Sequence, residues 1–478
     1  MLLTVGLVAS ATLAVVQTVR LEGARDRIQE LEEQVAETGG GGDGFLDEFQ
    51  EILEDLLGEG SGELGGAGAG FGTLLQCLTP EGGFLGGPTA PSEAGGPVEQ
   101  QVAAIADEVE RIRKLEFSQQ VEPEFLSGEE AGARIQELFL KEYTVETADR
   151  ESRILSALGA IPPGTDLRAL RSETLGQQVV GFYEPETGEL VVRTSGDELS
   201  PLDKVTLAHE LEHALADQRL QLPVPDDPRP GMEDADLAAL AVVEGDATLT
   251  MQRFSQALPL DEQLGLIDPE AVAESEAGLA ELPVYLEQEL LFPYEEGLSF
   301  VCGLYAQGGW EAVNEAYASP PITTAQVLFP DRYASGEGPV EPRPASDPAP
   351  QWQPAGSLQL GAANLLWLFR APGGESGSAL EDPEAAAGEW AGGQTYLYTD
   401  RGRSAVALTL VDRQGGGRLC DSVAEWYSRA IRDDREQRDA GPELVTDGDR
   451  QDGVLTCVGD EVRLGIAPNQ ATASALVR

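Results

Sequence analysis

The sequence contains very few basic side chains. Its 478 residues include 31 lysines and arginines against 84 aspartates and glutamates, which gives a formal net charge of −53 at pH 7. Only three residues are lysine, namely Lys114, Lys141 and Lys204. A polyanion of this kind repels DNA, RNA and anionic lipid, because phosphate binding depends on lysine and arginine. The composition therefore excludes a nucleic-acid partner and predicts a solvated acidic surface.

Cysteine is also scarce, and its spacing excludes two common uses. The four cysteines are Cys77, Cys302, Cys420 and Cys457, and no two of them form a C-x-x-C pair. This argues against a cysteine-ligated zinc site and against a thioredoxin-like motif. An even count suits two disulfides in an oxidising compartment. We favour the pair Cys420–Cys457, because both residues flank elements of one C-terminal region. Four buried thiols are the alternative.

The chain has only two histidines, His209 and His213, and residues 209–213 read H-E-L-E-H. On an α-helix, residues i and i+4 share a face, so both imidazoles can bind one Zn²⁺. Glu210 would lie about 100° further round the helix. Its carboxylate could there act as a general base on a metal-bound water. The motif therefore predicts a zinc site on a helix.

A catalytic zinc needs a third protein ligand and one open position for water. Glu244 is the best candidate, because it lies on the most apolar face of a predicted helix over residues 234–254. An unpaired carboxylate on such a face would be costly. Rival ligands in the same helix are Asp234, Asp236 and Asp246. An arginine partner for Glu244, or a wet groove beside it, is the alternative to metal binding.

The chemistry also needs groups around the metal. Without a third histidine, the donor that stabilises a developing oxyanion has to be a tyrosine, an arginine or a backbone N–H. The candidate tyrosines are Tyr294, Tyr183 and Tyr333. Imidazole ligands usually donate their other N–H to a carboxylate or carbonyl. Asp217, four residues after His213, and Asp246, two after Glu244, are candidates for that role, with solvated surface acids as the alternative.

Residues 98–335 have the pattern of a globular domain. The runs 178–183 and 189–193 flank a Pro/Gly turn and predict a β-hairpin. The next helix begins with Ser200 as N-cap and Pro201 at its first position, and it carries both histidines. A sheet edge beside that helix would offer backbone hydrogen bonds to an extended peptide.

Three segments precede this domain. Residues 1–19 carry no charged side chain and can just span a bilayer. Because a heptad-like helix over 20–38 follows, we expect an uncleaved single-pass anchor in the cell membrane, with the rest of the chain outside. A cleaved signal peptide and secretion are the alternative. The helix over 20–38 predicts a short coiled-coil stalk or weak homodimer seam. Residues 39–97 predict a Gly-rich linker with an amphipathic helix over 44–57.

The end of the chain reads as a separate module. Residues 336–356 are rich in proline and predict a linker, and residues 357–478 predict a small α+β module. Its expected elements are a helix over 360–369, strands at 395–398 and 405–411, a helix over 420–435, and strands at 454–458 and 462–466. The fold class we expect is α+β, with a mainly helical first domain that contains a small β-hairpin or sheet.

The H-E-x-x-H helix and residues 243–247, which read V-E-G-D-A, resemble the gluzincin group of zinc metallopeptidases, to which thermolysin belongs. With G-F-Y-E-P at 181–185, the chain looks more like poorly characterised, often membrane-anchored bacterial and archaeal metallopeptidases. The resemblance covers roughly residues 98–333. It implies a zincin-like fold, zinc on His209, His213 and Glu244, and Glu210 as general base. Two features depart from it: Thr248 stands where those enzymes have an aspartate, and no downstream histidine exists.

Taken together, the residues predict a membrane-tethered, zinc-dependent metallopeptidase that hydrolyses a peptide or protein substrate. A non-catalytic binding or scaffold protein that retains the same fold is the alternative. The presence of Glu210 favours the enzyme, since a protein without turnover has no need of a general base.

Overall fold

The computed structural model describes residues 6–7, 77, 97–194, 199–225, 229–266, 278–375, 377–430, 437–439, 443–446 and 451–478. The predicted stalk and the amphipathic helix over 44–57 lie outside these residues, and so does the predicted anchor over 1–19, apart from Gly6–Leu7. Among the helices that are described, none has both the length and the hydropathy of a membrane span. The anchor, stalk and amphipathic helix therefore stay predictions.

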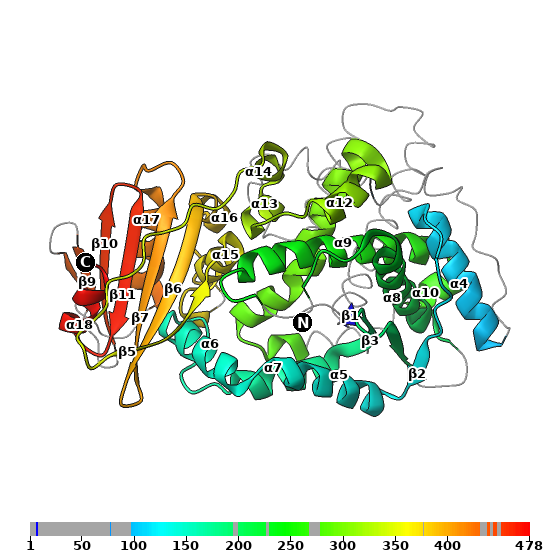
Figure 1. The fold of residues 1–478 in the computed structure, drawn as a ribbon, viewed down its shortest axis with the longest axis horizontal. Helices are drawn as coiled ribbons and strands as arrows, with labels where there is room; N and C mark the ends of the chain where they lie inside the picture. Colours follow the sequence, from blue (N-terminus) through cyan, green and yellow to red (C-terminus); the bar gives the residue numbers. More distant parts are fainter. Residues whose placement is uncertain are drawn as a thin grey trace, which may run out of the picture.

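The first region is a group of helices around a small sheet (Figure 1). The helices are α4 Val98–Arg113, α5 Gly128–Glu142, α6 Val145–Ala157 and α7 Leu167–Gln178. The strands are β1 Gly6–Leu7, β2 Glu124–Leu126, β3 Val179–Glu184 and β4 Glu189–Arg193, in the order β1-β3-β4-β2. Strands β3 and β4 form the predicted antiparallel hairpin, with Gly181 opposite Val192.

Helix α8, Pro201–Leu220, begins as the sequence predicts. The hydroxyl of Ser200 accepts the N–H of Asp203, and the carboxylate of Asp203 accepts the N–H of Ser200. This reciprocal cap satisfies amide groups that a helix start otherwise leaves unpaired. Every residue from Val205 to Ala216 is buried, so the central turns of α8 cross the interior of the protein.

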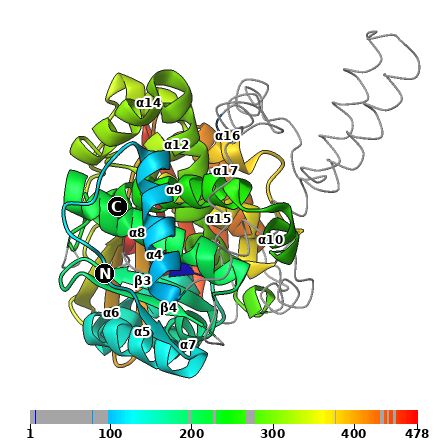
Figure 2. The same cartoon turned by 90° about the vertical axis from the view of Figure 1, so that its right-hand side faces the viewer.

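Helix α9, Glu233–Ala257, packs against α8 and against α12, Val284–Ala318, and α4 lies across α8 and α9 (Figure 2). Glycines set the close approach of α9 and α12. A Cβ on Gly245 would lie 2.3 Å from the carbonyl of Gly297. The remaining helices of this region are α10 Leu260–Gly265, α13 Thr324–Leu328 and α14 Pro330–Ser335.

The C-terminal region is a seven-stranded antiparallel sheet at one end of the molecule, in the order β5-β6-β7-β11-β10-β9-β8 (Figure 1). Its strands are β5 Gln353–Gln359, β6 Trp390–Asp400, β7 Arg403–Asp412, β8 Gln437–Asp439, β9 Glu443–Thr446, β10 Asp452–Val458 and β11 Glu461–Ala467. Its helices are α15 Ala362–Arg370, the 3-10 turn η1 Pro372–Gly374, α16 Pro383–Ala387, α17 Arg418–Ala430 and α18 Gln470–Leu476. Each element predicted for the C-terminal module overlaps an observed one. Residues 337–352, within the predicted linker, form neither helix nor strand.

One apolar core continues from the helical region into the C-terminal region. Trp367 of α15 packs edge-on against Tyr285 and Phe292 of α12. Two disulfides are present, Cys77–Cys302 and Cys420–Cys457. The predicted pair is thus confirmed, and the alternative of four thiols is wrong. The fold mixes helices with two sheets and is compatible with the predicted α+β class.

Candidate metal centre

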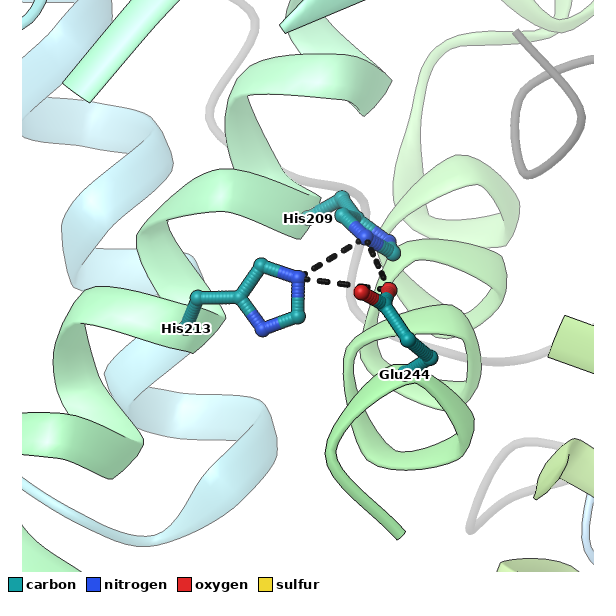
Figure 3. Close-up of side chains that lie close together, drawn as sticks. All are labelled: His209, His213 and Glu244. Atoms are coloured by element: carbon teal, nitrogen blue, oxygen red, sulfur yellow. Dashed lines mark hydrogen bonds and ion pairs between the residues drawn. The ribbon is translucent and has the colours of Figure 1, made fainter. Parts of the chain in front are cut away.

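Two neighbouring helices bring three metal-binding side chains together. His209 and His213 project from α8 toward Glu244 of α9 (Figure 3). The Nε2 atom of His209 lies 3.1 Å from Nε2 of His213 and 3.2 Å from Oε2 of Glu244. The Nε2 atom of His213 lies 3.4 Å from the same oxygen. Within the described part of the chain, these buried residues form the one group found that can hold a metal ion.

The three ligand atoms have the spacing of a tetrahedral metal site. Zinc bonds of about 2.0–2.1 Å to nitrogen or oxygen place tetrahedral ligands about 3.3–3.4 Å apart. The three observed separations are 3.1, 3.2 and 3.4 Å. Among the described residues, Nδ1 of both histidines and Oε1 of Glu244 are buried and have no hydrogen-bond partner. The spacing of the other three atoms, Nε2 of each histidine and Oε2 of Glu244, fits a metal ion.

The surroundings of His209 and Glu244 shift their pKa values toward the protonation states that metal binding needs. It lowers the pKa of His209 below its ordinary value of 6.5, so this ring is neutral at pH 7. Burial by itself would raise the pKa of Glu244, but the charges and hydrogen bonds of His213 and His209 outweigh it and lower that pKa below 4.5. Neutral imidazole and ionised carboxylate are the forms that bind metals.

Glu210 is fully buried beside the ligands, and neither of its carboxyl oxygens has a hydrogen-bond partner among the described protein atoms. Gly181 lets strand β3 lie directly on this part of α8. A Cβ at position 181 would come within 2.9 Å of Thr206 and 3.1 Å of Glu210. Burial, together with the charge of Glu244, raises the pKa of Glu210 well above its usual range. A buried carboxyl with a raised pKa suits proton transfer.

The rival third ligands have other partners. Asp234 accepts hydrogen bonds from the backbone N–H and the hydroxyl of Thr324, and Asp236 pairs with Arg229. Asp246 pairs with Arg113. Of the four acids that the sequence offered as a third ligand, the structure brings Glu244 to the histidines.

One of the three candidate tyrosines lies at the metal centre. The ring of Tyr294 stacks on the ring of His209, with 6.3 Å between their centroids, and Tyr294 is buried. The hydroxyl of Tyr333 instead donates to the carbonyl oxygen of Ser319 at 2.8 Å. The sequence could not show which of Tyr294 and Tyr333 lies near His209. Their positions depend on the packing of α12, which carries Tyr294, and of α14, which carries Tyr333.

The two aspartates predicted to accept a hydrogen bond from a ligand imidazole have other partners. Asp217 accepts a hydrogen bond from the hydroxyl of Tyr183 at 2.8 Å, because its side chain reaches strand β3. Asp246 accepts a hydrogen bond from Tyr317 at 2.9 Å and pairs with Arg113 at 2.8 Å. The carboxylate of Asp217 thus accepts its hydrogen bond from Tyr183 instead of from a ligand imidazole, and the hydroxyl of Tyr183 donates to Asp217.

A buried charged cluster, which sequence reasoning missed, lies next to His213. We call it the Arg113 cluster, and it consists of Arg113, Glu212, Asp246, Asn314 and Tyr317. The Nε atom of Arg113 lies 3.3 Å from Oε1 of Glu212, and Nη2 lies 2.8 Å from Oδ2 of Asp246. All three of these side chains are 0% exposed. Burial and the nearby Asp246 raise the pKa of Glu212 well above its usual range, against the effect of Arg113.

One signal in the sequence pointed toward this cluster. Glu212 is a second acid between the two histidines, on a helix whose central turns are buried all round. A buried acid of that kind needs a partner. Its partner, Arg113, stands 99 residues earlier in the chain, and no local pattern connects the two.

Comparison of the chain with protein-family models, with curated proteins and with solved structures found no match. The function therefore has to be inferred from the residues and their geometry.

Proposed function

We propose that the protein is a zinc-dependent metallopeptidase of the gluzincin type. In this proposal His209, His213 and Glu244 are the metal ligands, and Glu210 is the general base. The supporting observation is the triangle of ligand atoms with sides of 3.1–3.4 Å, beside a buried Glu210 whose oxygens have no partner in the described chain. Two histidines and a glutamate leave one position open, as a catalytic zinc requires.

The residues have separate tasks in peptide hydrolysis. Zinc in such a site supplies Lewis acidity, which polarises a carbonyl and lowers the pKa of water toward about 7. Glu210 accepts the proton from the attacking water and delivers it to the leaving amine. Its raised pKa makes Glu210 a stronger proton acceptor than an exposed glutamate would be.

Tyr294 is our proposed donor to the developing oxyanion. Its ring stacks on the ring of the proposed ligand His209, with 6.3 Å between the two centroids. An oxyanion donor is effective when it is fixed in a buried site before the reaction begins. Tyr294 meets the condition of burial.

The proposed substrate is a peptide or protein, and the proposed location is outside the cell membrane, tethered through residues 1–19. Both disulfides support an oxidising location, because such bonds persist mainly outside the cytosol. Secretion after cleavage of the first segment remains the alternative location.

Metal analysis and a cleavage assay on the purified full-length protein test the proposal. We expect one zinc per chain and hydrolysis of members of a fluorogenic peptide library. Glu210→Gln should lower hydrolysis by about 10²- to 10⁴-fold while zinc is retained, and Glu244→Gln should lose zinc. Wild-type protein that takes up no zinc would overturn the proposal. Zinc uptake without cleavage of any peptide would instead support the binding or scaffold protein.

A further inference from the structure

Arg113, the last residue of α4, contacts both helices that carry the metal ligands. Glu212 directly precedes His213 on α8, and Asp246 follows Glu244 by two residues on α9. The guanidinium pairs with both carboxylates. A single planar group therefore joins α8 and α9 beside the ligand residues. Metal bond lengths vary by only about 0.2 Å, so the spacing of these two helices matters for metal binding.

Glu212 also faces the ring of His213. Neighbouring residues on a helix point about 100° apart, yet Oε2 of Glu212 lies 3.9 Å from Nδ1 of His213. Arg113 holds the other oxygen, Oε1. Both Oε2 and Nδ1 are buried, and neither has a hydrogen-bond partner among the described residues. Histidines that bind a metal through one ring nitrogen usually donate the other N–H to a carboxylate or carbonyl, and Glu212 offers that acceptor.

Helix α12 fixes the orientation of Arg113. Asn314 accepts a hydrogen bond from Nη2 at 3.0 Å, and the ring of Trp310 lies 4.2 Å from Cζ. Tyr317 donates to Asp246, the second carboxylate that Arg113 contacts. The guanidinium is therefore held by stacking and by hydrogen bonds at once, which restricts it to one orientation.

We propose that Arg113 is a positioning residue of the metal centre, which holds Glu212 against His213 and holds α9 against α8. This inference rests on the proposed metal site. Arg113 acts through two carboxylates. In the metal-loaded protein the 3.9 Å between Oε2 of Glu212 and Nδ1 of His213 would shorten to a hydrogen bond, in which Nδ1–H donates to Glu212. Asp246 would fix the turn of α9 that carries Glu244.

The first test compares two arginines. Arg171 is also enclosed by carboxylates, in a group that we call the Arg171 cluster, made of Arg171, Glu151, Glu289 and Tyr143. Lysine keeps the charge and loses the planar fork. Zinc affinity of full-length Arg113→Lys, measured by competition with a chelator, should fall about 10- to 100-fold. Arg171→Lys should bind zinc as wild type does. Equal zinc affinity in the two variants would overturn the proposal.

The second test observes the ring of His213 directly. Because His209 and His213 are the only histidines, ¹⁵N-histidine labelling gives signals from just these two rings. Glu212→Gln in zinc-loaded protein should shift the Nδ1 signal of His213, leave that of His209 in place and weaken zinc binding about tenfold. The matched control Glu151→Gln should change neither ring. An unchanged His213 signal in Glu212→Gln would contradict the proposed role.

These results separate the inference from the proposed function. If wild type binds no zinc, both are overturned. If wild type binds zinc and Arg113→Lys and Glu212→Gln bind it equally well, only the role of Arg113 is overturned. If the lysine variant does not fold, Glu212→Gln and its ring signals still decide the question.

Discussion

Two arginine clusters among the described residues have nearly the same composition, although one is buried and the other is partly exposed. Arg113 pairs with Glu212 and Asp246, and Arg171 pairs with Glu151 and Glu289. In each, a tyrosine hydroxyl donates to one carboxylate. In each, an aromatic ring lies under the guanidinium, with 4.2 Å from Cζ to the ring centre for Arg113 and 5.2 Å for Arg171.

The two clusters differ in their contact with water and in their hydrogen bonds. The arginine and both carboxylates of the Arg113 cluster are 0% exposed, whereas those of the Arg171 cluster are 13–30% exposed. Arg113, Glu212 and Asp246 each keep a buried polar atom without a partner in the described chain, and the Arg171 cluster has no such atom there. Burying charges with incomplete hydrogen bonding costs stability.

The comparison teaches that two arginine clusters of nearly the same composition can differ in exposure and in hydrogen bonding. The Arg171 cluster is complete, so it joins α6, α7 and α12 and nothing more is needed to explain it. The Arg113 cluster is incomplete on the side of His213, next to the metal ligands. An arrangement that costs stability is expected where function requires it, and this one lies beside the proposed metal ligands.

The largest expected effect comes from replacing Glu210, which precedes Glu212 of the Arg113 cluster by two residues, and it is compared with the replacement of Glu151 in the Arg171 cluster. Glu210→Gln should lower the rate of peptide hydrolysis by about 10²- to 10⁴-fold, because the general base is lost. The same change should leave the stability of metal-free protein unchanged or higher, since a buried carboxyl with a raised pKa is removed. Hydrolysis assays and thermal unfolding check this. Glu151→Gln is the control and should do the reverse, with lower stability and normal turnover per folded molecule.

The second effect is on stability. Arg113→Met leaves two fully buried carboxylates unpaired and should lower the free energy of unfolding by about 3–5 kcal/mol. Arg171→Met should cost less, about 1–3 kcal/mol, because its carboxylates reach water. Denaturant unfolding of metal-free protein measures both. Equal losses would mean that the difference in exposure between the clusters has no energetic consequence.

The third effect depends on pH. Burial depresses the pKa of His209 in the folded protein below 6.5, so the unfolded chain binds more protons as the pH falls through 6.5. The contribution of His209 to the stability of metal-free protein should therefore be constant above that pH and decline below it. Zinc affinity should fall at lower pH, where His209 of the folded protein takes up its proton, by roughly tenfold per pH unit for each proton displaced. Unfolding curves and chelator competition from pH 8 to 5 test both. Replacement of Glu151 by Gln should leave this profile unchanged.

The smallest effect concerns Tyr183 and Asp217, which lie outside both clusters. Tyr183→Phe removes one hydrogen bond of 2.8 Å and should cost about 0.5–1.5 kcal/mol of stability. Zinc affinity should stay as in wild type, because Asp217 pairs with the tyrosine rather than with a histidine. A loss of zinc affinity in this variant would show that Asp217 supports the metal centre as well.

Local parts of the site could be predicted from the sequence. The helical repeat places His209 and His213 on one face whatever surrounds them. The cap at Ser200 and the hairpin around its Pro/Gly turn are formed by neighbours in sequence, so their residues carry the signal. The disulfide Cys420–Cys457, between residues 37 apart in the chain, could also be predicted, because both cysteines flank elements of one small module.

Contacts between distant segments were decided by the tertiary structure. Glu244 was one of four candidate acids, 35 residues after His209, and the packing of α9 on α8 selected it. Arg113 and Glu212 are 99 residues apart, and Cys77 and Cys302 are 225 apart. The sequence by itself thus determined which helix carries the histidines and the proposed general base. Only the packing of α4, α9 and α12 around that helix determined the proposed third ligand and the charges that surround it, because side-chain packing between distant segments leaves no periodic pattern in the chain.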